Sequence, residues 1–377
     1  MRLVGCCCTL LVLVATAGCR KSEGNVTVIS GADAVEMSFE DVASDIELVP
    51  LVSPDPVEYG GVYIAGDELL MTDIDRTRLW YFRNHKLVSE LDAKGRGRGE
   101  YGDLFHISYS PAGHTLFVKP AGDVSFIEYD VPSMRFTGKI PCEDYLSSFV
   151  AVDEGRVLGF TNNGKSGKSL SVIDIPSGES RISFELTFSE CEYANFGRVV
   201  REPFKVALGL SDYVNRLGWL DREGRFEEVF KFTFSDGMPK NIYDTGTGDM
   251  DDMIDYVLYQ SQEHYFFGVM MPVINDDGFT FWYCNNNGPA GDDSWLRLYC
   301  HNDEKDYQAK NLYITGLNFV VQPDGVTDDG GYYSVICGPE ELIKDPIREP
   351  SPLAERILEA VRNQKDDNPV IMYYKIR

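Results

Sequence analysis

A strand-turn-strand phrase recurs along this chain and constrains its fold more than any other feature of the sequence. Each copy joins an apolar run, often ending on Asp or Asn, to a tight polar turn and a second apolar run. The copies begin at residues 79, 125, 171, 217 and 296, as "LWYFRNHKLVSEL", "SFIEYDVPSMRFTGKI", "SVIDIPSGESRISFEL", "LGWLDREGRFEEVFKF" and "LRLYCHNDEKDYQAKNLYI". Repeats of about 45 residues built from strands are typical of β-propeller blades. The longer gap before the fifth copy predicts an insertion around residues 235–265.

The remaining body of the chain also has the pattern of short strands. Runs such as "GVYIAG", "HISYS", "TLFVK" and "FVAVD" are rich in Val, Ile, Phe and Tyr, and turn residues separate them. The composition, 43% apolar and 12% aromatic, supplies a sizeable core and argues against disorder. We therefore predict an all-β chain, and such chains often remain a single domain at this length.

Residues 1–18 are predicted to be a removable export signal. Arg2 precedes an apolar run, Leu3 to Ala17, that is too short to span a bilayer as a helix. The run ends in Thr16-Ala17-Gly18-Cys19, which resembles the lipobox of bacterial lipoproteins, where the cysteine is lipidated. The alternative is an ordinary signal peptide cleaved nearby.

Lipidation of Cys19 would make the membrane a partner of this protein. More than one acyl chain, each contributing about 0.8 kcal/mol per buried methylene, gives stable anchoring. We expect residues 19–40 to form a lipidated tether. No Asp stands next to Cys19; an Asp there would resemble an inner-membrane retention signal. The expected location is therefore the cell envelope, with the outer membrane preferred and its periplasmic or surface face left open.

The charge balance excludes nucleic acid as a partner. The chain has 60 acidic and 35 basic residues and a formal net charge of -25, whereas nucleic-acid binding needs a basic footprint. The stretch from Gly97 to Gly102 formally satisfies GxGxxG, but a dinucleotide site requires a helix that begins in this loop. The following "DLFHISYSPAGHTLFV" predicts two strands instead. We predict no nucleotide and no other cofactor.

Cysteine spacing argues against a bridge between Cys284 and Cys300 and predicts no metal site. Cys284 and Cys300 flank a candidate hairpin, in which Cys284 would face roughly Trp295 while Cys300 lies at the far end of its strand. Such a separation is too large for a disulfide. The sequence has no CxxC motif and no Cys/His cluster, so we predict no metal site.

The end of the chain combines a helix with a terminal strand. "SPLAERILEAVRNQ" predicts a helix near residues 352–363, capped by Ser351 and with Leu353, Ile357, Leu358 and Val361 on one face. The final "VIMYYKIR" is too apolar to remain unpaired. We expect it to pair with "DIELVPL" near the mature N-terminus, which would close a ring.

Four features together resemble the six-bladed β-propeller lipoproteins of Bacteroidetes, which are similar to NHL-type repeat propellers. These features are the lipobox, "IELVPL" as the opening strand, "KGRGRGEYG" after the first blade and "NPVIMYYKIR" at the close. Arg98 replaces the proline of the family's glycine-loop pattern, and the residues that match it in order are Lys94, Gly95, Gly97, Gly99, Glu100 and Tyr101. The resemblance implies one six-bladed domain over residues 41–377, with four-stranded antiparallel blades and a ring closed by the N- and C-terminal strands.

Two sets of residues are candidates for binding. Arg96, Arg98, Glu100 and Tyr101 would lie on a loop at the axial face, where two arginines can meet an anionic group. The alternative is that this loop only joins two blades, with its glycines supplying backbone freedom. Trp282 and Trp295 flank "NNNGPAGDDS" and are candidates for stacking on sugar rings. The alternative for both is core packing.

Three classes of function remain open. We expect a noncatalytic lipoprotein that binds or scaffolds a protein, peptide or glycan partner, because rigid blades can present variable loops. The alternative is a metal-dependent hydrolase or lyase of the lactonase-like propeller type, which would need carboxylates such as Asp73, Asp123, Asp153 and Asp324 to converge. A role in an outer-membrane nutrient-uptake system rests on the resemblance alone. No GxSxG, HExxH or paired-acid motif is present, so we predict no catalytic residue.

Overall fold

The computed structural model describes residues 26–377 except residues 58, 74, 103, 121–124, 143–145, 164–166, 188–189, 191–193, 239, 241–264, 286–295, 303–305, 318, 338–349 and 365–367. The predicted signal peptide, Cys19 and most of the insertion predicted at residues 235–265 therefore lie outside the described residues.

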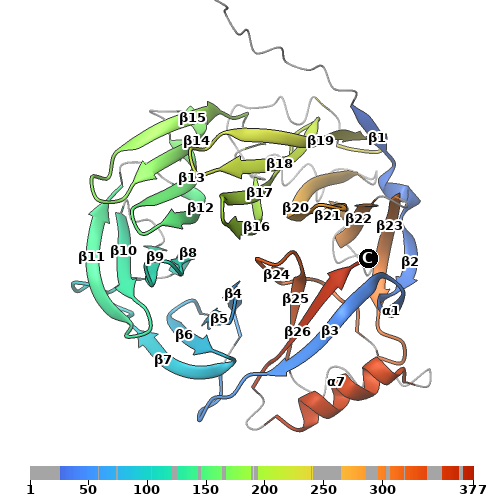
Figure 1. Cartoon of the computed structure of the whole chain (residues 1–377), viewed down its shortest axis with the longest axis horizontal. Helices are drawn as coiled ribbons and strands as arrows, with labels where there is room; N and C mark the ends of the chain where they lie inside the picture. The colour runs from blue at the N-terminus through green and yellow to red at the C-terminus, as the bar shows by residue number, and fades with distance from the viewer. Residues whose placement is uncertain are drawn as a thin grey trace, which may run out of the picture.

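Six antiparallel sheets form a closed ring, as predicted (Figure 1). Blade 1 contains β4 (Gly61–Ala65), β5 (Glu68–Thr72), β6 (Arg78–Arg83) and β7 (Lys86–Asp92). Blade 2 contains β8 (Leu104–Ser110), β9 (Thr115–Pro120), β10 (Ser125–Asp130) and β11 (Arg135–Pro141). Blade 3 contains β12 (Leu146–Asp153), β13 (Arg156–Asn163), β14 (Gly167–Asp174) and β15 (Ser180–Glu185).

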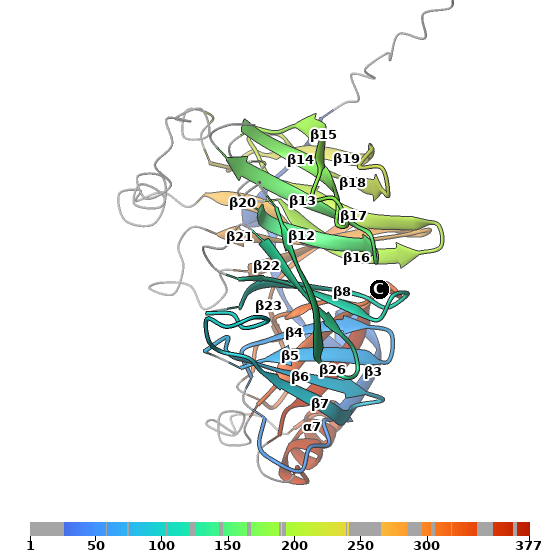
Figure 2. The same ribbon diagram turned by 90° about the vertical axis from the view of Figure 1, so that its left-hand side faces the viewer.

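The second half of the ring repeats this order. Blade 4 contains β16 (Asn195–Arg201), β17 (Phe204–Leu210), β18 (Asn215–Asp221) and β19 (Phe226–Phe234). Blade 5 contains β20 (Phe266–Asn275), β21 (Gly278–Asn285), β22 (Leu296–Asn302) and β23 (Asp306–Tyr313). Blade 6 contains β24 (Gly325–Val326), β25 (Tyr332–Ile336), β26 (Val370–Ile376) and β3 (Ala43–Pro50). The first strand of each blade lies nearest the axis, and Figure 2 shows the antiparallel strands of blade 1 side by side.

The recurring phrase of the sequence is the hairpin between the third and fourth strands of blades 1 to 5. Inner strands are apolar on both faces because each blade packs between two neighbours. In β6, for example, Leu79 and Tyr81 join the cluster shared with blade 2, whereas Trp80 and Phe82 join the cluster shared with blade 6. The outer strand β7 instead alternates exposed and partly buried residues. Six hydrophobic clusters result, one at each junction between blades.

The ring is closed by the two ends of the chain, which confirms the prediction made from the terminal strand. β26 pairs antiparallel with β3, with Ile371 opposite Val49 and Met372 opposite Leu48. β3 is the outermost strand of blade 6. Ile371 and Met372 are fully buried, so closure contributes core as well as backbone hydrogen bonds.

The N-terminal segment departs from the predicted tether of residues 19–40. β1 (Thr27–Ile29) pairs in parallel with β19, and β2 (Val35–Ser38) pairs in parallel with β23. Blades 4 and 5 thereby gain a fifth strand. We call residues 26–38 the strap. The strap therefore belongs to the folded body, where the sequence predicted part of a tether.

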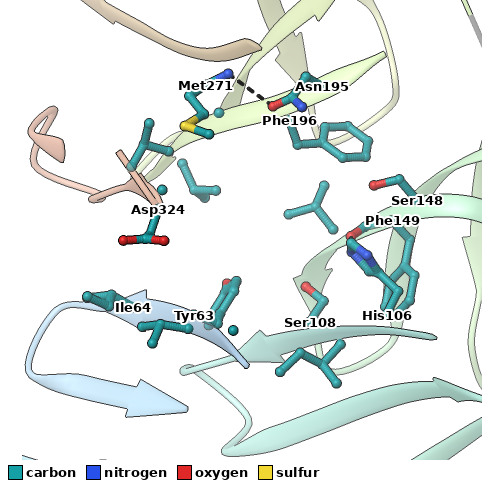
Figure 3. A pocket seen from close by; sticks show the side chains of 18 of the residues that line it. Tyr63, Ile64, His106, Ser108, Ser148, Phe149, Asn195, Phe196, Met271 and Asp324 are labelled. Atoms are coloured by element: carbon teal, nitrogen blue, oxygen red, sulfur yellow. Dashed lines mark hydrogen bonds between the residues drawn. The ribbon is translucent and has the colours of Figure 1, made fainter. Parts of the chain in front are cut away.

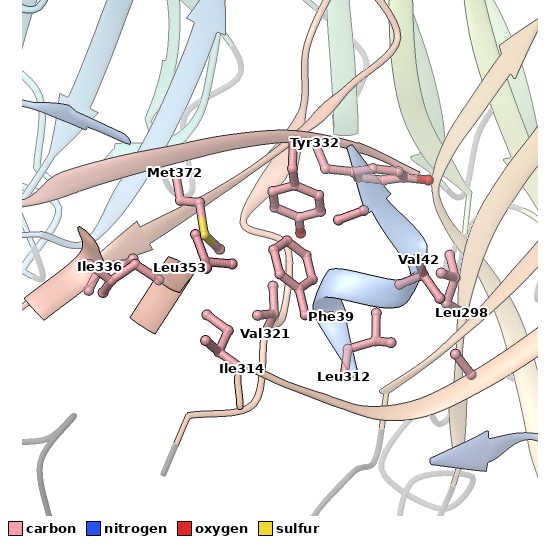
Figure 4. Packing of buried hydrophobic residues seen from close by; sticks show 14 of the residues in the cluster. Phe39, Val42, Leu298, Leu312, Ile314, Val321, Tyr332, Ile336, Leu353 and Met372 are labelled. Atoms are coloured by element: carbon pink, nitrogen blue, oxygen red, sulfur yellow. The ribbon is translucent and has the colours of Figure 1, made fainter. Parts of the chain in front are cut away.

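The C-terminal helix α7 (Pro352–Arg362) covers the junction of blades 5 and 6. Its N-cap is Ser351, as predicted, and the Ser351 hydroxyl accepts a hydrogen bond from the amide of Ala354 at 3.1 Å. Leu353 packs with Phe39 of the short helix α1 (Phe39–Val42) in one apolar cluster (Figure 4). No helix among the described residues is long and apolar enough to cross a membrane.

Candidate functional site

The glycine loop between β7 and β8 is held by its own contacts. Gly99 has a φ of 78°, and a Cβ there would lie 2.6 Å from Phe136, so only glycine fits without a shift. The amide of Gly97 donates to Glu100 Oε2 at 2.6 Å, and the Tyr129 hydroxyl donates to the carbonyl of Gly99 at 2.6 Å. A strand follows the loop, so the helix that a dinucleotide would need is missing here.

The four binding candidates of this loop divide into two groups. Tyr101 is buried, and its hydroxyl donates to the carbonyl of Thr77 at 3.1 Å, which makes it a packing residue. Arg96, Arg98 and Glu100 are exposed, and the Arg98 guanidinium lies over the Phe136 ring at 5.6 Å. None of the four lines the central channel. The contacts of this loop match its structural interpretation, while binding by its arginines remains a prediction.

The tryptophan candidates do not form a stacking platform in the described structure. Trp282 is 2% exposed and packs edge-on against Tyr332, with ring centroids 6.3 Å apart. Its ring faces are therefore covered, as the core-packing alternative requires. Trp295 lies outside the described residues. In the same hairpin Cys284 faces Leu296 and Cys300 faces Thr280, so the two buried cysteines are not bonded to each other.

The three described aspartates of those that a metal-dependent hydrolase would need do not converge. Asp73 accepts hydrogen bonds from the amides of Thr77 and Arg78 in a turn, and Asp153 pairs with Arg156 and Arg222. Asp123 lies outside the described residues, and only Asp324 of the other three reaches the channel. Among the described residues, no group of three or more His, Cys, Asp or Glu side chains is placed to hold a metal ion.

The site that the structure reveals is the channel along the axis of the ring (Figure 3). It encloses a cavity of about 440 Å³ lined by residues from all six innermost strands. Tyr63, His106, Ser148 and Phe196 come from blades 1 to 4, and Met271 comes from blade 5. Because each wall belongs to a different blade, only the closed ring assembles this cavity.

Polar groups of the channel connect neighbouring blades. His106 lies in blade 2 and its Nε2 donates to the carbonyl of Phe149 in blade 3 at 3.0 Å. The Ser108 hydroxyl accepts from the amide of Ala151 at 2.8 Å. Burial lowers the pKa of His106, so this imidazole is neutral near pH 7. These bonds hold the walls in place.

One end of the channel is crossed by Arg201, the last residue of β16. Its guanidinium donates to the carbonyl of Ala151 in blade 3 at 3.3 Å and to the Tyr63 hydroxyl in blade 1 at 3.4 Å. It also lies 3.7 Å from Asp328 Oδ2, next to blade 6. Burial raises the pKa of Asp328, while the charge of Arg201 opposes that change. Arg201 thus links four blades at this level.

The other end of the channel is lined by Gly60, Thr72 and Arg76. Asp324 lies on the channel wall, where it accepts from the amide of Val335 at 2.6 Å and from the Tyr59 hydroxyl. Burial raises the pKa of Asp324, against the effect of these two hydrogen bonds. Arg76 and Asp324 both line this channel and are both exposed.

Sequence reasoning missed the channel residues Tyr63, His106, Ser108, Arg201 and Asp328. The first three lie in "GVYIAG" and "HISYS", runs that have the pattern of ordinary strands. A usable signal existed, because the first strand of each blade lines the axis once the blades are assigned. The reach of Arg201 across the ring has no local signal.

A family model and one crystal structure agree with this architecture. Residues 19–185 match the DUF5128 family, described as a 6-bladed beta-propeller; the match ends at the last residue of β15. A Bacteroides fragilis protein described as exported has a crystal structure with a TM-score of 0.67 and 12% identity, over 94% of this chain and 100% of its own. A member of the DUF4221 family from Bacteroides vulgatus has a TM-score of 0.47 and 11% identity, over 89% of this chain and 98% of its own. No curated protein matches significantly.

Proposed function

We propose that this chain is an exported, lipid-anchored propeller that binds a partner in its central channel without catalysing a reaction. The observation that carries the proposal is the cavity of about 440 Å³ whose walls come from six different blades. Ligand sites in proteins are typically preformed, concave and mostly apolar, with a few fixed polar groups. The interblade hydrogen bonds of His106 and Ser108 supply that rigidity.

The lining favours a peptide segment or a glycan over a small apolar ligand. Tyr63 and Phe196 contribute aromatic surface, while Ser148 and Arg76 contribute hydrogen-bonding groups. Peptides and sugars present apolar faces together with polar edges, and aromatic rings bind such faces well. Entry from the end near Arg76 is expected, because Arg201 crosses the other end.

The contacts of the polar lining residues support binding rather than catalysis. A nucleophile needs a base within hydrogen-bond reach. The Ser108 hydroxyl instead accepts from a backbone amide, and His106 donates to a backbone carbonyl. Both groups are engaged in holding the ring.

Anchoring at Cys19 follows from the lipobox-like Thr16-Ala17-Gly18-Cys19. The similarity to a Bacteroides fragilis protein described as exported agrees with a place in the cell envelope. We propose the outer membrane, as the sequence after Cys19 suggests.

A peptide library and a glycan array, each probed with three forms of the protein, test the proposal. The Ser148→Trp variant fills the channel, while Val88→Trp adds the same ring at an exposed position on the outer strand of blade 1. We expect the unmodified protein and Val88→Trp to bind the same ligand and Ser148→Trp to lose it. Equal binding by all three would refute the channel as the site. Turnover of a lactone panel by protein with stoichiometric bound metal would refute the noncatalytic role.

A further inference from the structure

We propose that the strap and the outer edge of blade 4 form a surface that contacts the lipid bilayer, so that blade 1 points away from the membrane. This inference rests on the proposed lipid anchor at Cys19. It adds an orientation and a second contact, which the anchor alone does not imply.

The covalent distance between anchor and strap is short. Val26 lies seven residues after Cys19, and a fully extended chain of that length spans at most about 25 Å. The strap begins at the outer edge of blade 4, where β1 pairs with β19. The edge of blade 4 therefore stays near any bilayer that holds the acyl chains of Cys19.

The strap is fixed to the ring by specific contacts. Asp236 accepts hydrogen bonds from the amides of Gly31 at 2.8 Å and Ala32 at 2.9 Å. The Arg297 guanidinium donates to the carbonyl of Gly31 at 2.8 Å. A Cβ at Gly31 would collide with the ring of Phe266, so the turn lies directly against blade 5. Because these contacts hold the strap against the ring, an anchor at Cys19 would tether the ring by the edge of blade 4.

Exposed apolar side chains gather at this edge. Five of the eight exposed large hydrophobic residues of the described structure belong to the strap or to blade 4: Val26, Val28, Val35, Tyr213 and Val229. Val28 is 65% exposed and is paired with Thr233. The Thr233 hydroxyl donates to the carbonyl of Tyr213 at 3.0 Å, which brings Val28 and Tyr213 into one area. Clustered exposed apolar residues mark interaction surfaces, and a tyrosine suits the membrane interface.

Charge favours the same orientation. Arg20 and Lys21 directly follow Cys19, and basic residues beside an anchor are attracted to anionic lipids.

The test uses the full-length lipidated protein in vesicles of phosphatidylethanolamine and phosphatidylglycerol. An environment-sensitive fluorescent amino acid is placed by amber suppression at Val28, at Tyr213 or at Val88. Val88 is the matched control, because it is 48% exposed on the outer strand of blade 1, across the ring from blade 4. Tyr213 provides a second probe site should the label at Val28 disturb β1.

We expect a blue shift and quenching by brominated lipids at Val28 and Tyr213, and neither response at Val88. Mass spectrometry verifies that the protein is acylated. In acylated protein, an equal or larger response at Val88 would overturn the proposed surface, and so would no response at any of the three sites; neither result would contradict the anchor. If mass spectrometry found Cys19 without acyl chains, both the proposed anchor and the proposed orientation would be refuted. A blue shift at Val28 that increases with protein concentration in the absence of lipid would overturn the proposed bilayer contact. It would indicate that a second copy of the chain covers this surface.

Discussion

Glu68 joins blades 1 and 2, and replacing it should weaken the ring in a way that depends on pH. The side chain is 7% exposed. Its carboxylate accepts hydrogen bonds from the Tyr81 hydroxyl at 2.5 Å, the Arg83 guanidinium at 2.8 Å and the Tyr109 hydroxyl at 2.7 Å. Tyr109 belongs to β8 of blade 2, and the other two partners belong to β6 of blade 1. The perturbation is Glu68→Gln, which keeps the size and removes the charge.

The expected loss follows from the number and type of these bonds. A hydrogen bond to a charged group contributes about 1.5–3 kcal/mol and a neutral one about 0.5–1.5 kcal/mol, so three bonds together lose about 3 kcal/mol. The Arg83 side chain is 39% exposed, and water screens its share. We therefore expect the free energy of unfolding to fall by about 2–3 kcal/mol at pH 7.

The pH dependence has a definite sign. Burial raises the pKa of Glu68, but the hydrogen bonds from Tyr81, Arg83 and Tyr109 outweigh it, so the net pKa lies below the ordinary value of 4.5. A carboxylate whose pKa is depressed by folding contributes stability above its unfolded pKa, and this stability is lost as the pH falls through the folded value. The difference between the two proteins should thus be full at pH 7 and shrink below pH 4.5.

Guanidinium unfolding followed by near-ultraviolet circular dichroism, at pH 7 and at a series of values below 4.5, measures this difference. Glu90→Gln is the matched control, because Glu90 is 43% exposed and lies 3.8 Å from Arg78. It should change stability by less than about 1 kcal/mol. Equal stability of Glu68→Gln and the parent at pH 7, or a difference that widens in acid, would refute the reasoning.

Three further changes test closure, the glycine loop and the strap. Ile371→Ala removes a fully buried side chain from the closing strand, and we expect a loss of about 2–5 kcal/mol in denaturant unfolding; an unchanged midpoint would contradict closure as a source of stability. Gly99→Ala should lower the free energy of unfolding by about 1–3 kcal/mol, because Gly99 has a positive φ and lies close to Phe136. Gly102 has open space around it, so Gly102→Ala is the neutral control in the same thermal melt. Gly31→Ala should release the strap, so hydrogen exchange at Thr27–Ile29 accelerates while β26 stays protected; protection retained at both places would show that Phe266 can move aside.

Two candidate binding residues, Tyr101 and Trp282, show what a local sequence pattern cannot predict. In the sequence Tyr101 lies in a polar glycine loop and Trp282 lies beside a polar turn, but both are buried in the structure. Their burial depends on the neighbouring blade: Tyr101 reaches Thr77, and Trp282 packs on Tyr332. Strand alternation indicates two faces but does not indicate whether a second sheet covers each of them.

The sequence by itself determined the features that are encoded locally. The hairpins of blades 1 to 5, the cap of α7 at Ser351 and the terminal strand β26 follow from apolar periodicity, turn residues and capping chemistry, which act over a few residues. The tertiary structure alone decided which residues far apart in the sequence come into contact. Examples are the hydrogen bond from Arg201 to Tyr63, the hydrogen bonds of the strap to Asp236 and the channel walls supplied by six blades. Those contacts join residues 138 and 205 positions apart, and they depend on the twist and the closing angle of the blades, which no local pattern encodes.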